Sequence, residues 1–326
     1  KRRAVEQRAE TQMVIPARYK TVSARGDRIL LDVPKAKEES SGGILLPSSL
    51  QSRPGFGTVV DVGDGELEGG KTHTFQVKAG DTLLFTTYAV GRIKLKLEGR
   101  EGKEIIMMPE GDAIGIMPRE NPDYTDIENL KPLFNSVLLR MAPEPKEDGG
   151  IFLVGGKRER PKCGHVVRKA PGRIKDGNHV PIESVEENDF VMIVGGGTEI
   201  ETGIDSWNVI DASYICGKMP FASEREVYEL EPFDDWMIMK MEEPPQETKA
   251  GLLLNTRLSG QTTLAVVVKA GPGIKDPMSG ELKPNEFEPG DRVMFRNENL
   301  NIFDGPNQGD KYLLLRQKDV ICKVQE

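Results

Sequence analysis

Few residues of this chain are suited to catalysis or metal binding, and they are widely separated. Its three cysteines, Cys163, Cys216 and Cys322, share no short spacing, and the 326 residues include three histidines. Cys163 and His165 could supply half of a metal site, but structural zinc sites are built from two such pairs, and the sequence offers no second pair. We expect a strand side chain at Cys163, an exposed His165, no bound metal, and a reducing compartment without disulfides.

A phosphate-binding loop is the other chemistry that the sequence suggests. Gly63 and Gly65 frame a Gly-x-Gly segment. Neither a following helix nor the Gly-Lys-Ser/Thr signature of a nucleotide site accompanies it. His73 and His179 fall in segments that predict hairpin tips, where we expect them to be solvated. No set of nucleophile and base stands out, so we expect no cofactor and no enzymatic activity.

The composition is that of an ordinary globular protein, with 29% charged and 37% hydrophobic residues. The net charge is −8, and charges of both signs are spread along the chain. A nucleic-acid binder usually presents a basic face, and a membrane span needs roughly 20 apolar residues. Neither feature is present, so we expect neither nucleic acid nor a membrane as a partner.

The first 20 residues are rich in basic side chains. They include Lys1, Arg2, Arg3, Arg8 and Arg18. Together with a first residue that is not Met, they fit what remains after an organelle-targeting peptide is removed. A frayed or truncated terminus is the alternative. Residues 4–13 form the one segment that predicts a helix.

The segments that would carry a function recur three times along the chain. A glycine followed by three apolar residues appears at intervals of 107 and 101 residues. The copies are Gly43-Ile44-Leu45-Leu46, Gly150-Ile151-Phe152-Leu153 and Gly251-Leu252-Leu253-Leu254. Two further markers, at residues 57, 164 and 265 and at Asp81, Asp189 and Asp291, nearly keep this spacing. Three markers in one order predict three tandem domains, which we place at residues 17–119, 129–220 and 230–326.

Each copy has the pattern of a small all-β domain. The apolar runs are short, and Gly, Pro and Asp clusters separate them. In the first copy these runs are residues 28–31, 57–62, 82–85 and 105–108. They predict a compact barrel or sandwich of short strands. The segments at residues 66–71, 173–178 and 274–280 predict the tips of β-hairpins.

The glycine and apolar triplet of each copy do not look like core. In the first copy, polar residues 35–42 precede the triplet and Pro47-Ser48-Ser49 follows it. Such flanks bury too little apolar surface to order themselves, and exposed apolar side chains on a mobile loop are costly unless a partner covers them. We therefore expect the three triplets to bind a partner, with plain core strands as the alternative.

A family resemblance rests on a series of motifs. In the first copy they are Asp27-Arg28-Ile29-Leu30, Ser41-Gly42-Gly43-Ile44-Leu45-Leu46, Gly57-x-Val59-x-x-Val62-Gly63-x-Gly65 and Val77-x-x-Gly80-Asp81. The sequence resembles the GroES-type co-chaperonins, and each copy covers one whole subunit. The later copies depart at Ser136 and Trp236, where the family favours Arg, and at Ala265, where it favours Gly.

The resemblance implies three GroES-like β-barrels, each with a mobile loop and a roof β-hairpin. In that family, seven domains form a dome that caps a GroEL-type chaperonin ring, and the apolar triplets dock at the ring's mouth. Tandem domains are typical of chloroplasts. The resemblance therefore implies a co-chaperonin that assists protein folding in the chloroplast stroma, with the mitochondrial matrix as the second choice.

Three domains do not divide evenly into seven. A seven-domain ring would therefore combine this chain with one- or two-domain GroES-like subunits, as a hetero-oligomer. Two other functions remain open from the sequence. The same triplets could dock on a seven-fold Clp-type protease ring, which has apolar clefts, or the fold could serve as a scaffold with no chaperone role.

Overall fold

The computed structural model describes residues 11–19, 21–34, 55–86, 92–98, 103–142, 162–175, 177–202, 204–220, 227–242, 264–276, 279–296, 300–305, 307 and 309–324. In these residues the chain is all-β, as the sequence predicts, and its helices are short 3-10 turns. No helix in this part of the chain is long and apolar enough to cross a membrane.

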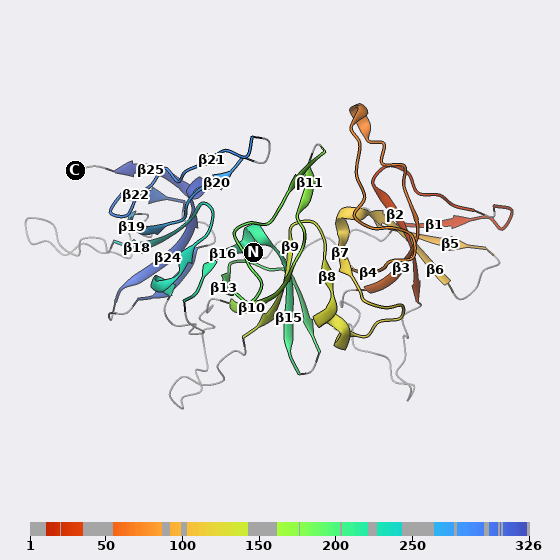
Figure 1. Ribbon diagram of the computed structural model, residues 1–326, viewed down its shortest axis with the longest axis horizontal. Coiled ribbons are helices and arrows are strands. Elements are labelled where there is room, and N and C mark those ends of the chain that lie inside the picture. Colours follow the sequence, from red (N-terminus) through yellow and green to blue (C-terminus); the bar gives the residue numbers. More distant parts are fainter. Residues whose placement is uncertain are drawn as a thin grey trace, which may run out of the picture. The chain divides into compact units, whose positions relative to one another are not determined.

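The first repeat forms a sheet of order β1-β5-β6-β2-β3-β4-β7-β8 (Figure 1). The strands are β1 (Thr11–Ile15), β2 (Arg28–Pro34), β3 (Gly55–Val62), β4 (Thr82–Phe85), β5 (Ile93–Leu97), β6 (Lys103–Pro109), β7 (Ala113–Ile116) and β8 (Lys131–Pro132). The four apolar runs predicted for this copy all lie in strands. The last strand, β8, belongs in sequence to the second repeat.

The second repeat forms a sheet of order β14-β15-β9-β10-β13-β16-β17. The strands are β9 (Ser136–Met141), β10 (Lys162–Lys169), β13 (Phe190–Ile193), β14 (Thr198–Glu201), β15 (Ser206–Asp211), β16 (Ile215–Lys218) and β17 (Glu231–Pro232). Six neighbouring strands of this sheet, in the order β14-β15-β9-β10-β13-β16, repeat the order β5-β6-β2-β3-β4-β7 of the first sheet. The seventh, β17, comes from the third repeat.

The third repeat forms a sheet of order β23-β24-β18-β19-β22-β25. The strands are β18 (Trp236–Met241), β19 (Leu264–Ala270), β22 (Arg292–Phe295), β23 (Asn301–Asp304), β24 (Lys311–Arg316) and β25 (Val320–Val324). The same six-stranded order therefore occurs three times. Among the described residues, no strand follows β25.

The predicted hairpins form in the second and third repeats. They are β11 (Arg173–Lys175) with β12 (Asn178–Val180), and β20 (Ile274–Lys275) with β21 (Leu282–Lys283) (Figure 1). In the first repeat the corresponding segment holds an isolated bridge between Glu66 and Thr72 and a 3-10 turn, η1 (Glu68–Gly70). This hairpin therefore has fewer paired residues than the other two.

The helix predicted at residues 4–13 is wrong where it can be checked. Residues 11–13 belong to strand β1, which pairs in parallel with β5 from Thr11 opposite Ile93 to Ile15 opposite Leu97. The rest of the prediction lies outside the described residues. Backbone pairing along the edge of β5 overrides the weak local preference for helix.

Apolar side chains of the central strands form the cores. The four residues of β4 are all buried, and Ile29, Leu31, Val59, Leu83, Phe85 and Ile106 belong to the core of the first repeat. By backbone contacts the chain divides into two compact units, residues 1–138, 168–182 and 197–210, and residues 139–167, 183–196 and 211–326. The boundary between the units runs through the second repeat.

Candidate functional site

Each predicted docking loop joins two neighbouring antiparallel strands. In the first repeat, β2 pairs with β3, with Asp32 opposite Thr58. In the third repeat, β18 pairs with β19, with Met241 opposite Ala265, and the Glu242 N–H donates to the Leu264 carbonyl at 3.1 Å. The two ends of each of these connections are therefore held side by side by the sheet.

The second repeat holds its loop ends in the same way, since the Ala142 N–H donates to the Cys163 carbonyl at 2.9 Å. The connections at residues 35–54, 143–161 and 243–263 are each about 20 residues long, whereas hairpin loops usually have two to five. The predicted binding residues 43–46, 150–153 and 251–254 lie outside the described residues, so their partner-binding role stays a prediction.

A hollow of about 510 Å³ lies at the base of the third connection, next to Lys240, Glu242, Arg292 and Asp310. Its charged side chains are already paired, Lys240 with Asp310 at 2.7 Å and Arg292 with Glu242 at 2.7 Å. The ion pair raises the pKa of Lys240 and lowers the pKa of Asp310. These contacts tie the first end of the connection to β22 and to the segment before β24, and they pair the charged side chains of the hollow with one another.

The two glycines of the Gly-x-Gly segment are required by the local backbone structure. A Cβ at Gly63 would lie 2.3 Å from the Gly26 carbonyl oxygen, and Gly65 has a φ of +75°. Glycine is needed for close approach at the first position and for the left-handed backbone at the second. This accounts for both residues without a phosphate.

The cysteines and His165 fit their predicted structural roles. Cys163 is buried, His165 is exposed, and all three cysteines are free. Burial raises the pKa of the Cys216 thiol, which makes it a poor nucleophile. In the part of the chain that is described, no group of three or more His, Cys, Asp or Glu side chains could hold a metal ion.

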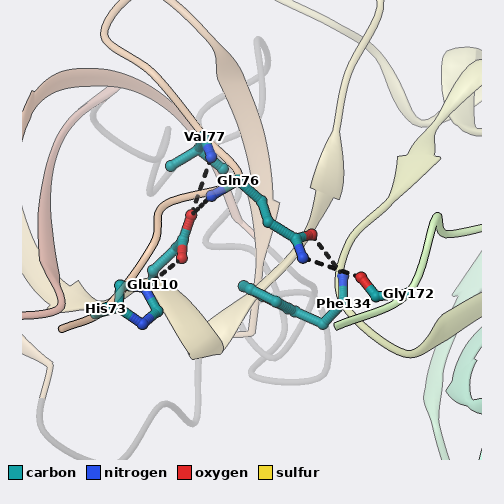
Figure 2. A network of polar contacts seen from close by, with 6 residues as sticks. All are labelled: His73, Gln76, Val77, Glu110, Phe134 and Gly172. Atoms are coloured by element: carbon teal, nitrogen blue, oxygen red, sulfur yellow. Dashed lines mark hydrogen bonds and ion pairs between the residues drawn. The ribbon is translucent and has the colours of Figure 1, made fainter. Parts of the chain in front are cut away.

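The sequence predicts a solvated His73, but in the structure its side chain contacts a buried glutamate. Its Nε2 lies 2.6 Å from Oε2 of Glu110, whose side chain is fully buried (Figure 2). The other carboxylate oxygen of Glu110 accepts hydrogen bonds from the Gln76 and Val77 N–H groups at 2.7 and 2.9 Å. A buried carboxylate needs such partners, so Glu110 fixes the backbone at residues 76–77.

Gln76 then links the first repeat to the second. Its Nε2 donates to the Gly172 carbonyl at 2.9 Å, and its Oε1 accepts from the Phe134 N–H at 3.1 Å (Figure 2). Phe134 has a left-handed φ of 58°, in a tight turn that presents its N–H to Gln76. The side chain thus satisfies two backbone groups of the next repeat.

The second and third repeats also share a junction. One apolar cluster combines Met192 and Cys216 of the second repeat with Leu230, Trp236 and Leu314 of the third. An ion pair between Glu183 and Lys275 joins the two repeats at the hairpin. Both side chains of this pair are more than half exposed, so the pair contributes little to stability. The apolar cluster is therefore the main stabilising contact of this junction.

Both junctions pass a strand from one repeat to the next. We call β7, β16 and β25 the closing strands, and residues 21–25, 129–133 and 229–233 the leading segments of the three repeats. The leading segment of the second repeat pairs with β7 through β8, and that of the third pairs with β16 through β17. The Leu133 N–H donates to the Ile114 carbonyl at 3.2 Å, and the Phe233 N–H donates to the Cys216 carbonyl at 3.0 Å.

Glycines in the closing strands make room for this pairing. A Cβ at Gly115 would lie 2.7 Å from the Lys131 carbonyl oxygen and 2.8 Å from the Leu130 side chain. A Cβ at Gly217 would lie 2.3 Å from the Glu231 carbonyl oxygen and 2.8 Å from the Leu230 side chain. Such separations are too short for real contacts, so β7 and β16 accept the neighbouring segment only because they carry glycine at these positions.

Sequence reasoning did not identify these junction residues. The first and second repeats place Gln76 and Ser184 at one position, so no shared residue type marks the bridge. The one usable signal was Leu-x-Pro, which recurs at residues 130–132 and 230–232 in front of a strand, together with Gly115 and Gly217 at the preceding strand.

The comparison with protein families follows the same three repeats. The family described as the chaperonin 10 kDa subunit matches at residues 21–117, 129–219 and 229–324. The chain belongs to this family. Its all-β repeats are therefore GroES-like small β-barrel domains, arranged in tandem.

Individual members of the family also match. A 20 kDa chloroplastic chaperonin of Spinacia oleracea is 29% identical over 59% of this chain and 72% of its own length. One of Arabidopsis thaliana is 34% identical over 52% of this chain and 64% of its own length. The co-chaperonin GroES of Marinobacter nauticus is 35% identical over 28% of this chain and 92% of its own length. This chaperonin 10 chain thus resembles both tandem-domain and single-domain relatives.

Proposed function

We propose that this chain is a co-chaperonin subunit that contributes three domains to a seven-domain dome over a GroEL-type chaperonin ring. One observation carries the proposal, and it recurs in all three repeats. Each repeat of a chaperonin 10 chain holds the ends of a connection of about 20 residues side by side, and each connection carries a glycine and three apolar residues. The chain binds and caps, with no catalytic role.

The energetics of such loops suit a lid that must come off. Burying one Leu or Ile side chain contributes about 1.5–3 kcal/mol, and ordering the loop backbone costs about 1–2 kcal/mol per residue. One loop alone therefore binds weakly. Three loops on one chain raise the effective concentration of the second and third contacts, so the whole subunit binds while each contact stays reversible.

Replacing one apolar residue in each triplet tests the proposal. The variant Leu45→Glu, Phe152→Glu, Leu253→Glu should lose binding to a GroEL-type ring, because a buried carboxylate has no partner there. Binding is measured by co-sedimentation and electron microscopy of the mixed particles. The matched control is Ser48→Glu, Gly155→Glu, Thr256→Glu, which adds the same charges three residues further along each loop. Intact binding of the first variant would contradict the proposal.

The same pair of variants separates the two ring types. Mixing the protein with a Clp-type protease ring tests whether the triplets dock there instead. We expect complexes with the chaperonin ring alone, since the chaperonin 10 family matches all three repeats. A complex with the protease ring that the loop variant abolishes would favour an adaptor function.

Location and assembly follow from the same proposal. The two tandem-domain relatives are named as chloroplastic, and we place this chain in the chloroplast stroma. Since three domains do not divide into seven, the ring also contains GroES-like subunits with fewer domains. Native mass spectrometry of the isolated complex measures this composition, and a seven-domain mass assembled from two kinds of subunit is the expected result.

A further inference from the structure

The three repeats close the base of their long connections to different degrees. The residue six positions after the start of β2, β9 or β18 is Pro34, Ala142 or Glu242. The Glu242 N–H donates to the Leu264 carbonyl at 3.1 Å. The Ala142 N–H donates to the Cys163 carbonyl at 2.9 Å. Proline has no N–H, so this backbone hydrogen bond cannot form at Pro34.

The third repeat adds an ion pair at the same place. Nε of Arg292 on β22 lies 2.7 Å from Oε1 of Glu242. Strand β19, to which the connection returns, lies between β18 and β22 in the sheet. The ion pair therefore crosses β19 and ties the start of the third connection to the far side of the strand in which the connection ends.

The matching residues of the other repeats are uncharged. Thr82 and Phe190 take the place of Arg292, each directly after the aspartate that marks the repeat. Oγ1 of Thr82 lies 3.4 Å from Oγ1 of Thr58 on β3. The ring of Phe190 lies 4.7 Å from that of His165 on β10. These two contacts are with the returning strand, so the ion pair between the departing strand and its second neighbour is particular to the third repeat.

Such a pair acts on the chain freedom that is lost in docking. Making a connection of about 20 residues two residues shorter changes its closure by only about 1.2-fold, because the dependence on length is logarithmic. Holding the backbone of one residue in one conformation shifts an equilibrium by roughly 5- to 30-fold. An exposed ion pair supplies at most about fivefold of this, and the Arg292 and Glu242 side chains are 43% and 31% exposed. The expected effect is therefore a few-fold change in affinity.

We propose that Arg292 and Glu242 are positioning residues that hold the start of the third connection in place before docking. The third loop then docks with a smaller loss of chain freedom than a loop whose start is held by no such pair. This inference rests on the proposed function and deepens it, because it makes the three loops of one chain unequal in docking.

Exchanging the two charges tests the pair. Arg292→Glu and Glu242→Arg should each raise the Kd of the full chain for a GroEL-type ring roughly threefold to fivefold, because like charges then face each other at the base of the loop. The double variant restores the ion pair in reverse, so its Kd should return to the parental value. Isothermal titration calorimetry measures all four proteins.

Repeating the exchange in a chain that carries Leu253→Glu separates positioning from general stability. Leu253 belongs to the third triplet, so the third loop should no longer dock and the charge variants should have no further effect on the Kd. A purely structural role would weaken binding equally in both chains. Lys283→Glu is the matched control, because it breaks an exposed ion pair with Asp276 in the third hairpin and should leave the Kd unchanged.

Amide hydrogen exchange supplies a readout without the ring. In the free chain, Arg292→Glu should speed the exchange of the Glu242 N–H, which donates to the Leu264 carbonyl, and the double variant should slow it again. The difference between Arg292→Glu and the parent should fade at about 1 M salt, where the Debye length falls to about 3 Å.

An unchanged Kd in both single variants would overturn the proposal, and so would failure of the double variant to restore it. Neither result touches loop docking itself. Retained ring binding by the chain with all three triplets altered would instead reject the docking role, and this inference with it.

Discussion

At the scale of single residues, the buried Glu110 carboxylate organises the polar contacts beside the first junction. Its carboxylate is fully buried and holds three partners, His73 and the backbone N–H groups of Gln76 and Val77. Gln76 in turn reaches the second repeat. One carboxylate inside the first repeat therefore positions the side chain that forms the junction.

Glu110→Ala should destabilise the first repeat by about 1–3 kcal/mol, because the buried Val77 N–H and the half-buried Gln76 N–H lose their acceptor. The measurement is the first transition in chemical denaturation. Glu120→Ala removes an exposed glutamate of the same repeat and serves as the control. Equal effects of the two variants would show that the network adds nothing to stability.

Asp112 is a residue whose burial costs stability at neutral pH. Burial, and then the neighbouring Asp27 carboxylate, raise the pKa of Asp112 above its ordinary value, and its Oδ2 is buried without a hydrogen-bond partner in the described structure. A raised pKa in the folded state means that the ionised form is disfavoured there. The cost is therefore absent below the unfolded pKa of about 3.9 and grows as the pH rises through the folded value.

Asp112→Asn should accordingly raise the unfolding temperature at pH 7 and have a smaller effect near pH 4. Thermal melts across this pH range measure the difference between variant and parent. A gain that is the same at every pH would rule out ionisation as its cause.

At the scale of elements, the closing strands decide how the repeats join. Gly217→Ala should weaken the second junction by about 1–3 kcal/mol, since the added Cβ meets the Glu231 carbonyl oxygen. Hydrogen–deuterium exchange of residues 227–233 should become faster. Gly111→Ala is the control, because no heavy atom lies within 4 Å of its added Cβ. Unchanged exchange at residues 227–233 would argue against tight packing at this strand.

The strands of each domain could be predicted from the sequence because their signals are local. Apolar runs such as residues 82–85 are short, lie between turn residues and are buried as predicted. Strand β1 was missed because its partner, β5, lies about 80 residues away in the sequence, and propensity at residues 4–13 carries no information about it. The junctions were missed for the same reason, since Leu130 and Gly115 gain meaning only when paired.

The candidate site shows a similar division. The triplets could be found because they recur in register, and their loop ends lie where the repeat predicts. His73 was placed in solvent because nothing near it in sequence reveals Glu110, which lies 37 residues further along and closes the contact. Buried polar partners of this kind are set by the fold rather than by any local pattern.

At the scale of the whole molecule, the structural domain does not end where the sequence repeat ends. Residues 131–132 complete the first sheet, and residues 231–232 complete the second. A fragment of residues 1–119 should therefore aggregate more readily than one of residues 1–134, because its β7 edge is uncovered. Light scattering of the two purified fragments measures this. Equal solubility would show that β8 does not protect the edge.

The pairing of Ile116 with Lys131 also bears on how such a chain can arise. The last strand of one domain and the first of the next already lie against each other, so a connection of about 14 residues joins two points that are in contact. Closing so short a span costs little chain entropy. Fusion of separately encoded subunits would therefore leave every contact between them in place, and it would write the order of the domains permanently into the gene.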